Sequence, residues 1–509
     1  MAGADDDAIV MPVLLRSEPD RRRQTSVICD QVRSWAADPT SADLVARVLP
    51  SIERLAFDAP FADLRQAFRE LYDEVGPSGR RPAPCVSRML PREAFSEVGA
   101  IPDGPPLYAL QDMFLLTGRI ASLDRIIAMQ PSFLVAYVSS YVAIMYDDGP
   151  LSLPCRSYLA ALASARLHCQ YLIRQQAREF VRLQGPVQWL HDRAAVPDKL
   201  RLFDEVNALM AHQPWRLTPA LLRSMLSHSD LSVSELVHGI VILSTFHALC
   251  GLAQGLGAVD TDDDSDERST ATAATPKPAP PDSDEATQHL KVLLQTSMDV
   301  LLAQATSLKA TNHAHSGAHS APVTATQQPP AYPALCAPVL ADMQYEDYNV
   351  KSKIYRVLHM GEFDWKGHGY SLISRYWNDH TAQLLDDEFD LIYALTDNNL
   401  CQSVRDIDTG PFRRAIWHYT FRLFGVSDDA YNYQEVNIFL NRGLKAFIKK
   451  CACFPHLVTG GDFVSLGYSL RPDEIVHVAL LAMEARRQAT LLYALRALQQ
   501  STQVQTTAV

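Results

Sequence analysis

A cysteine in the first half of the chain offers the most specific candidate chemistry. Cys169 lies in the segment YLAALASARLHCQYLIRQQAREF, which runs from Tyr158 to Phe180 and carries apolar residues at helical spacing. One helix over this segment would turn Cys169 toward the core and bring Arg166 near its sulfur, where a guanidinium group favours the thiolate. Gln176 falls on the same stripe, and a buried amide needs a hydrogen-bonding partner. The pattern fits a reactive thiol, and it also fits an ordinary buried cysteine.

The other cysteines and a histidine cluster predict no metal site. The nine cysteines are scattered, odd in number and without a CxxC pair, which disfavours a disulfide framework or a zinc site. His313, His315 and His319 resemble a metal-binding tract, but their low-complexity surroundings favour a solvated loop. Unpaired cysteines indicate a reducing compartment, cytosolic or nuclear. We expect no cofactor and no metal.

Helices must position these residues. Thr218 with Pro219 predicts a helix start, and Ser232 with Glu235 predicts a capping box before a long apolar run. Near the C-terminus, EIVHVALLAMEARRQATLLYALRALQQ has apolar residues at spacings of three and four, which places Arg486, Arg487 and Arg496 on the solvent side. Sustained alternation of period two is hard to find. The fold class predicted is all-α.

Composition divides the chain into two helical domains and a linker. The segment TDDDSDERSTATAATPKPAPPDSDEATQ is acidic, rich in Pro, Ser, Thr and Ala, and unable to bury enough apolar surface to fold. Apolar residues at helical spacing then predict one linker helix near 287–306, on Leu290, Leu293, Leu294, Met298, Leu301 and Leu302. We therefore predict a partly disordered segment 1–39, a helical domain 40–257, a largely disordered linker 258–341, a helical domain 342–500 and a disordered tail 501–509.

Charge and hydropathy exclude several classes of function. The chain has 509 residues, a formal net charge of -12 and a mean hydropathy of -0.08, values typical of a globular protein. Ten acidic and four basic residues lie between Ala258 and Pro330, and Asp5, Asp6 and Asp7 lie near the N-terminus, so about three quarters of the net charge belongs to segments expected to be disordered. Such a balance disfavours nucleic acid as a partner. No unbroken run of eighteen apolar residues and no signal peptide is present, so we expect no membrane insertion.

Several uncommon strings resemble the sestrin family. They include ASARLHCQYL and AHQPW in the first half, and HGYSLI, RRAIWHY, EVNIFLNRGLKAFIKKCACFP and MEARRQATLLYALRAL in the second. The resemblance covers most of the chain outside the linker and tail. It implies two helical domains similar to the alkylhydroperoxidase AhpD.

In the first domain the resemblance implies a peroxide-reducing site. The family carries a cysteine, a tyrosine two residues later and a histidine seven residues after the cysteine. Cys169 and Tyr171 match the first two, whereas Gln176 stands in place of the histidine. An amide cannot accept the thiol proton, and the sequence offers no second cysteine beside Cys169 to resolve a sulfenate. The implied activity is at most that of a weak alkylhydroperoxide reductase.

In the second domain the resemblance implies a leucine pocket. Arg413 and Glu474 occupy the positions that bind the carboxylate and the ammonium of the amino acid, groups that cannot be buried unpaired. Thr396 and Thr409 match a loop that closes over the ligand, and Phe412 replaces an aliphatic residue. The same side chains also fit an inter-helix ion pair and two turn threonines.

Three positions of this pocket differ from the family. Asn399 replaces a third loop threonine, Asp397 replaces a tyrosine, and Gly467 stands where the family has a tryptophan. Loss of the indole wall would admit a different side chain. The ligand expected is therefore leucine or another apolar amino acid.

The resemblance also implies a protein partner. Asp428 and Asp429 match an acidic element that contacts the second GATOR complex, and Ser232 matches another position of that contact. The aspartates also fit a capped or solvated loop. The function implied is a stress and amino-acid sensor that restrains TOR complex 1. A peroxide-reducing enzyme and a ligand-free helical scaffold are the alternatives.

Overall fold

The computed structural model is almost entirely helical. It describes residues 9–77, 85–227, 230–260, 282–296, 332, 335, 345, 356–396 and 407–506. Within these residues the strands are β1 (Leu358–His359) and β2 (Val426–Ser427), which pair in parallel. The all-α prediction is confirmed. His313, His315, His319, Asp397 and Asn399 lie outside the described residues.

Contacts divide the chain into two compact units. The first comprises Met1–Val142 and Leu256–Thr275, and the second comprises Ala143–Gly255 and Pro276–Val509. The predicted domain boundaries rest on composition and stay a prediction. Helices α8 (Leu153–Arg166), α12 (Phe203–His212) and α14 (Val233–Gly255) belong to the same unit as the C-terminal helix α26 (Pro472–Thr506).

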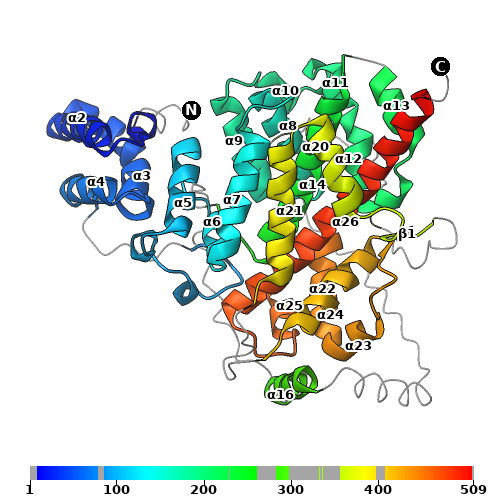
Figure 1. Ribbon diagram of the computed structural model, residues 1–509. Coiled ribbons are helices and arrows are strands. Elements are labelled where there is room, and N and C mark those ends of the chain that lie inside the picture. Colours follow the sequence, from blue (N-terminus) through cyan, green and yellow to red (C-terminus); the bar gives the residue numbers. More distant parts are fainter. Residues whose placement is uncertain are drawn as a thin grey trace. The chain divides into compact units, whose positions relative to one another are not determined.

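The first unit begins with three helices that pack on one another, drawn in blue in Figure 1. Arg21 of α2 binds both carboxylate oxygens of Asp63 on α4, at 2.8 and 2.9 Å. Helix α2 falls in the segment 1–39, where the sequence predicted partial disorder. The elements of this unit are η1 (Met11–Val13), α2 (Glu18–Ala37), η2 (Pro39–Ser41), α3 (Ala42–Asp58), α4 (Ala62–Val75), η3 (Arg92–Ala94), η4 (Val98–Ala100), α5 (Pro105–Thr117) and α6 (Ser122–Ile127), followed by α7 (Pro131–Met145), which runs across the unit boundary.

The second unit is built around α14 and α26, which pack along each other. Figure 1 shows α26, in red, as the longest helix of the unit, and α21, α22 and α24 also contact it. The remaining elements are α9 (Gln170–Arg182), α10 (Gln188–His191), η5 (Arg193–Ala195), α11 (Asp198–Arg201), η6 (Pro214–Arg216), α13 (Pro219–Ser227), α16 (Asp282–Gln295), the π-helical η7 (Trp365–Gly369), α20 (Tyr370–Tyr376), α21 (Asp379–Ala394), α22 (Gly410–Leu423), α23 (Gln434–Phe439), α24 (Arg442–Cys453), η8 (Pro455–Leu457) and α25 (Gly460–Val464).

Both predicted helix starts are confirmed. Leu221 N–H donates to the Thr218 hydroxyl at 3.2 Å, where α13 begins. The capping box before α14 is complete, because Glu235 N–H donates to Ser232 Oγ at 3.1 Å and Ser232 N–H donates to Glu235 Oε2 at 2.9 Å. Helix α14 is long and apolar enough to span a membrane, but it is wholly surrounded by the protein. It is the core helix of the second unit.

The predicted solvent side of α26 is wrong for Arg486 and Arg487, whereas Arg496 keeps 23% of its side chain exposed. Arg486 and Arg487 are buried at 0% and 2% exposure, because α14, α21, α22 and α24 surround this helix. Arg486 donates to the carbonyl oxygens of His247 and Ala211, at 2.7 and 3.1 Å. The helix also continues to Thr506, into the predicted tail, and Ser501 is buried.

The linker helix is present but begins earlier than predicted. Helix α16 spans Asp282–Gln295. Residues 297–306 of the predicted range 287–306 lie outside the described residues. Leu290 and Leu294 are buried, and α16 packs against α23. Its Thr287 hydroxyl accepts a hydrogen bond from Ser469 N–H at 2.9 Å. The helix therefore docks beside the segment that leads into α26.

Candidate functional site

The segment around Cys169 forms two helices where one was predicted. Helix α8 ends at Arg166, and His168 adopts a left-handed backbone with φ 57°. Cys169 N–H donates to Ser164 O at 3.0 Å and His168 N–H donates to Ala165 O at 3.1 Å, which is the Schellman pattern. Helices that end in this way usually have glycine at the left-handed position, whereas this helix has His168 there. Cys169 consequently stands at the N-cap of α9.

Burial of the stripe is confirmed despite the break. Cys169 and Gln176 are buried at 0% and 2% exposure, and so are the apolar members Leu162, Ala165, Leu172, Ile173 and Phe180. Tyr171, on the first turn of α9, is half-buried. The approach of Arg166 to the Cys169 sulfur stays a prediction. The roles of Cys169, Tyr171 and Gln176 in peroxide chemistry likewise stay predictions.

The expectation that no second cysteine lies beside Cys169 is wrong. Cys250 of α14 forms a hydrogen bond with Cys169, and a second one with Ser164. Burial raises the pKa of the Cys250 thiol well above its ordinary value, and the bond to Cys169 raises it further. Neither cysteine is in a disulfide. The packing of α14 on α8 brings together two thiols that are far apart in the sequence.

Three of the residues predicted to bind an amino acid lie close to the end of α21. The hydroxyls of Thr396 and Thr409 are 2.5 Å apart, so the two ends of the predicted loop are joined. Arg413 lies one helical turn beyond Thr409 and donates from Nη1 to Ala394 O at 2.8 Å and to Leu395 O. Its guanidinium group thus binds the last carbonyl oxygens of α21, the negative end of that helix. Phe412 beside it is buried.

Arg413 and Glu474 do not form the inter-helix ion pair that was the alternative interpretation. Among the described residues, the hydrogen bonds of Arg413 go to main-chain oxygens, and its Nε is buried without a partner. Glu474 lies in the first turn of α26, where its Oε2 accepts from Arg471 N–H at 2.8 Å and its Oε1 lies 3.7 Å from Arg471 Nε. Arg413 is therefore held by the end of α21, and Glu474 is held by the start of α26. The alternative of turn threonines fits Thr409, which is the N-cap of α22.

His477 belongs to this region and was missed by the sequence analysis. It lies three residues after Glu474, hence on the same face of α26. Burial lowers the pKa of His477 to about 4, and the charge of Arg413 contributes. The ring bonds the Ile392 backbone, while its Nε2 is buried with no partner. A Glu-x-x-His spacing at a helix start was the available signal.

A tryptophan would not fit at position 467 with the backbone conformation that Gly467 has. Its backbone is left-handed, with φ 73°, a conformation that side chains strain. A Cβ atom built there would lie 2.8 Å from Asn441 Nδ2, which donates to Leu466 O at 2.8 Å. The backbone at position 467 therefore favours glycine, and whether this position lines a pocket stays a prediction.

The parallel strand pair positions the acidic element. Because His359 of β1 is in register with Ser427 of β2, His359 Nδ1 lies 3.0 Å from Asp429 Oδ1. Asp429 keeps 68% of its side chain exposed. Asp428 accepts from Ala430 N–H at 2.9 Å, so it caps the turn as the alternative interpretation supposed. Ser232, the third predicted partner-binding residue, is exposed at the start of α14.

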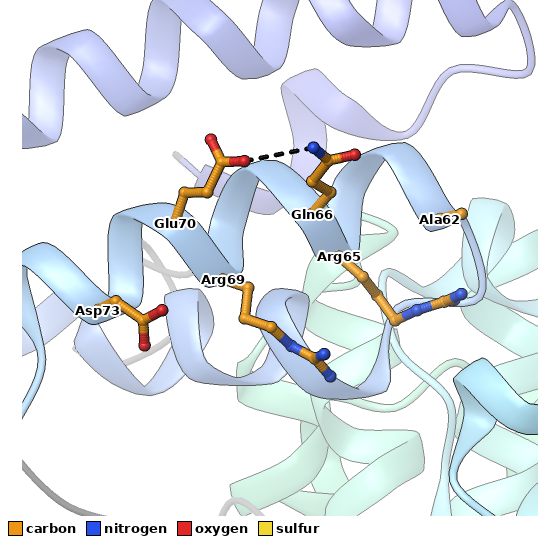
Figure 2. A pocket seen from close by; sticks show the side chains of 6 residues that line it. All are labelled: Ala62, Arg65, Gln66, Arg69, Glu70 and Asp73. Carbon is orange, nitrogen blue, oxygen red and sulfur yellow. Dashed lines mark hydrogen bonds between the residues drawn. The ribbon is translucent and has the colours of Figure 1, made fainter.

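A surface hollow elsewhere contains none of the predicted residues. It lies on α4 in the first unit and is lined by Ala62, Arg65, Gln66, Arg69, Glu70 and Asp73. Figure 2 shows Arg65 and Arg69 extending to the same side of the helix, while Gln66 donates to Glu70 at 3.3 Å. Alternating charges along one helix face are typical of a solvated surface. Among the described residues, no group of three His, Cys, Asp or Glu side chains could hold a metal ion.

Comparison with known proteins links these features. The chain matches the family model described as PA26 p53-induced protein (sestrin), over residues 105–329 and 288–502. It is 32% identical over 557 residues to the "Sestrin homolog" of Dictyostelium discoideum, covering 94% of this chain and 87% of that protein. It is 31% identical over 470 residues to "Sestrin-2" of Homo sapiens, covering 86% of this chain and 97% of that protein. The matched residues include both Cys169 and the region of Arg413 and Glu474.

Proposed function

Since the chain belongs to the sestrin family, we propose that it senses leucine or another apolar amino acid and restrains TOR complex 1 by binding the second GATOR complex. The observation that carries the proposal is the state of Arg413. This guanidinium group is buried at 9% exposure and bonded to carbonyl oxygens, with Nε unpartnered. A buried cation of this kind is stabilised by an anion, and the α-carboxylate of an amino acid matches the planar fork.

The ammonium group would be bound from α26. Because His477 bonds a backbone carbonyl through its other ring nitrogen, the unpartnered Nε2 is an acceptor in the neutral tautomer. Glu474 lies one turn earlier on the helix and supplies the negative charge. These three side chains would therefore receive both charged groups of a zwitterion.

The segment between Thr396 and Thr409 would couple ligand binding to a change elsewhere in the protein. A ligand shifts an equilibrium only by its difference in affinity for the two states. The hydroxyl contact of Thr396 with Thr409 and the bonds of Arg413 to the end of α21 hold both ends of this segment. A ligand that bonds Arg413 would compete with the α21 carbonyl oxygens, and α22 would transmit the change to β2 and the exposed Asp429.

The partner surface would include Asp429 and Ser232. Asp429 is the more accessible of the two aspartates, and its carboxylate near His359 could exchange this neighbour for a basic group of a partner. Ser232 would contribute through its position at the exposed start of α14, although its hydroxyl already completes the capping box.

Capture of the second GATOR complex by the full-length chain, with and without leucine, tests this function. We expect capture by the wild type and release at millimolar leucine. Arg413→Ala should retain capture and lose the response to leucine, whereas Asp428→Ala combined with Asp429→Ala should lose capture. Arg375→Ala, on the exposed face of α20, is the matched control and should behave as the wild type.

Two outcomes would contradict the proposal. Capture that leucine does not alter, together with no heat of leucine binding by calorimetry, would remove the sensor. Capture unchanged by the double aspartate variant would remove the acidic contact while leaving the ligand site intact.

A further inference from the structure

Two fully buried thiols lie side by side at the junction between α8 and α9. Cys169 and Cys250 are both 0% exposed and are hydrogen-bonded to each other. Their immediate polar neighbour is Ser164, whose carbonyl accepts from Cys169 N–H at 3.0 Å. The pair lies outside the predicted amino-acid pocket and is independent of the function proposed above.

The packing of α14 on α8 holds Cys250 in this place. His247 Nε2 lies 2.8 Å from Asn207 Oδ1, and Asn207 Nδ2 donates to Leu162 O at 3.2 Å. Two turns along the same helix, Gln254 Nε2 donates to His168 O at 3.1 Å. Positions 247, 250 and 254 share one face of α14, so Cys250 faces the α8 residues between Leu162 and His168.

The two thiols differ in their surroundings. Cys169 is the N-cap of α9, at the end of the α8–α9 junction. Its sequence neighbours His168 and Gln170 are exposed, although Cys169 itself is 0% exposed. Cys250 lies near the C-terminal end of α14, and its side chain is likewise 0% exposed. Because burial raises the pKa of the Cys250 thiol, Cys250 is a poor first nucleophile, and we assign the first attack on a peroxide to Cys169.

We propose that Cys169 and Cys250 are a redox pair, which a hydroperoxide converts into an intramolecular disulfide. The Cys169 thiolate attacks one peroxide oxygen, the O–O bond breaks, and the other oxygen leaves as an alcohol or water after protonation. Cys250 then attacks the sulfur of the Cys169 sulfenic acid, the S–O bond breaks, and the hydroxide leaves as water with the Cys250 proton. Two thiols supply the two electrons that reduce the peroxide, and a low-molecular-weight thiol reverses the disulfide by exchange.

This pairing changes the chemistry expected from the sequence. With Gln176 in place of a histidine, Cys169 lacks the expected base. A neighbouring cysteine nevertheless protects the sulfenic acid from further oxidation by capturing it. The disulfide would also join the α8–α9 junction covalently to the core helix α14.

Peptide mapping of the oxidised full-length chain tests the pair. After treatment with hydrogen peroxide and blocking of free thiols, trypsin without reduction releases Leu167–Arg174 and Ser224–Arg268, each with a single cysteine. We expect these two peptides to be joined and to separate after treatment with glutathione. In Cys250→Ser, labelling of Cys169 by dimedone should rise several-fold, because its sulfenic acid is no longer captured.

Cys155→Ser is the matched control, since Cys155 is also buried on α8 but bonds Ser152 at 3.2 Å. It should leave both the joined peptides and the dimedone labelling unchanged. The proposal is overturned if no joined peptides form at a peroxide concentration that oxidises the half-buried Cys85. Equal dimedone labelling of Cys169 in the wild type, Cys250→Ser and Cys250→Ala would overturn it as well.

Discussion

Several side chains at the candidate site of the second unit have hydrogen bonds or charge states that a bound ligand would change. Arg413 is bonded to the end of its neighbouring helix, and burial lowers its pKa against the opposing charge of Asp408. His477 is kept neutral by burial and by Arg413. Thr396 and Thr409 share a hydrogen bond between their hydroxyl groups. In the candidate site, Arg413 Nε and His477 Nε2 are buried nitrogen atoms without a hydrogen-bonding partner among the described residues.

At this scale, Gly467→Ala should destabilise the second unit. A residue other than glycine in a left-handed conformation costs about 1–2 kcal/mol, and the added Cβ must displace Asn441. Gly460→Ala is the control, because nothing lies within 4 Å of its Cβ position. Urea unfolding should show a loss for Gly467→Ala and almost none for Gly460→Ala. Equal stability of the two variants would contradict the left-handed backbone at position 467.

Helix α26 connects the candidate site to the core at the scale of elements. Its first turn carries Glu474 and His477, and its middle carries the buried Arg486 and Arg487. Arg487 binds Glu388 of α21 at 2.8 Å and Glu484 at 3.2 Å. Burial, together with the charge of Glu388, raises the pKa of Glu484 to about 8. One guanidinium group therefore binds two buried carboxyl groups.

We expect Arg487→Leu to be strongly destabilising. The substitution leaves the buried Glu388 without its cation, and breaking a buried pair costs about 3–5 kcal/mol. Arg356→Leu is the control, since it removes an exposed pair with Glu362 that contributes at most about 1 kcal/mol. Chemical denaturation compares the two, and similar small losses in both variants would show that the buried pair is not required.

On the scale of the whole molecule, the second unit buries neutral histidines. Burial lowers the pKa of His238 and His212 to about 3 and that of His418 to about 4. His238 accepts from Leu151 N–H at 3.4 Å, and its Nε2 lies 2.8 Å from Ile144 O, so Nε2 carries the proton. Below pH 6.5 the unfolded chain binds protons that these rings in the folded protein do not.

The protein should therefore unfold at a higher pH during acidification than it would if only its surface charges titrated. The stabilising effect of the buried histidines is complete above pH 6.5 and is lost as the pH falls toward 3. Each histidine contributes a slope of about 1.4 kcal/mol per pH unit in this range. Glu484 acts in the opposite sense, since its raised pKa makes its contribution decline between about pH 4.5 and 8.

His238→Gln isolates one of these histidines, because glutamine keeps a donor and an acceptor but does not titrate. We expect the dependence of the unfolding free energy on pH between 6 and 4 to become shallower by up to about 1.4 kcal/mol per pH unit. His380→Gln, at an exposed position of α21, should keep the wild-type slope. An unchanged slope in His238→Gln would mean that the ring is protonated in the folded protein.

The sequence by itself determined the features that local residue patterns encode. Helical periodicity specified an all-α protein and the burial of Cys169 and Gln176, and short-range capping signals located the starts of α13 and α14. The resemblance to sestrins pointed to Arg413 and Glu474 before their surroundings were known. Such features depend on neighbours a few residues away, so they can be predicted from the residues themselves.

Only the tertiary structure decided which distant side chains meet. It broke the predicted helix at His168, where backbone bonds to Ser164 and Ala165 support a left-handed residue that is not glycine. It buried Arg486 and Arg487 by surrounding α26, and it brought Cys250 to Cys169 and His477 to Arg413. These contacts arise from helices that pack across long separations in the sequence. No local pattern encodes such a contact, because its energy appears only when the core is formed.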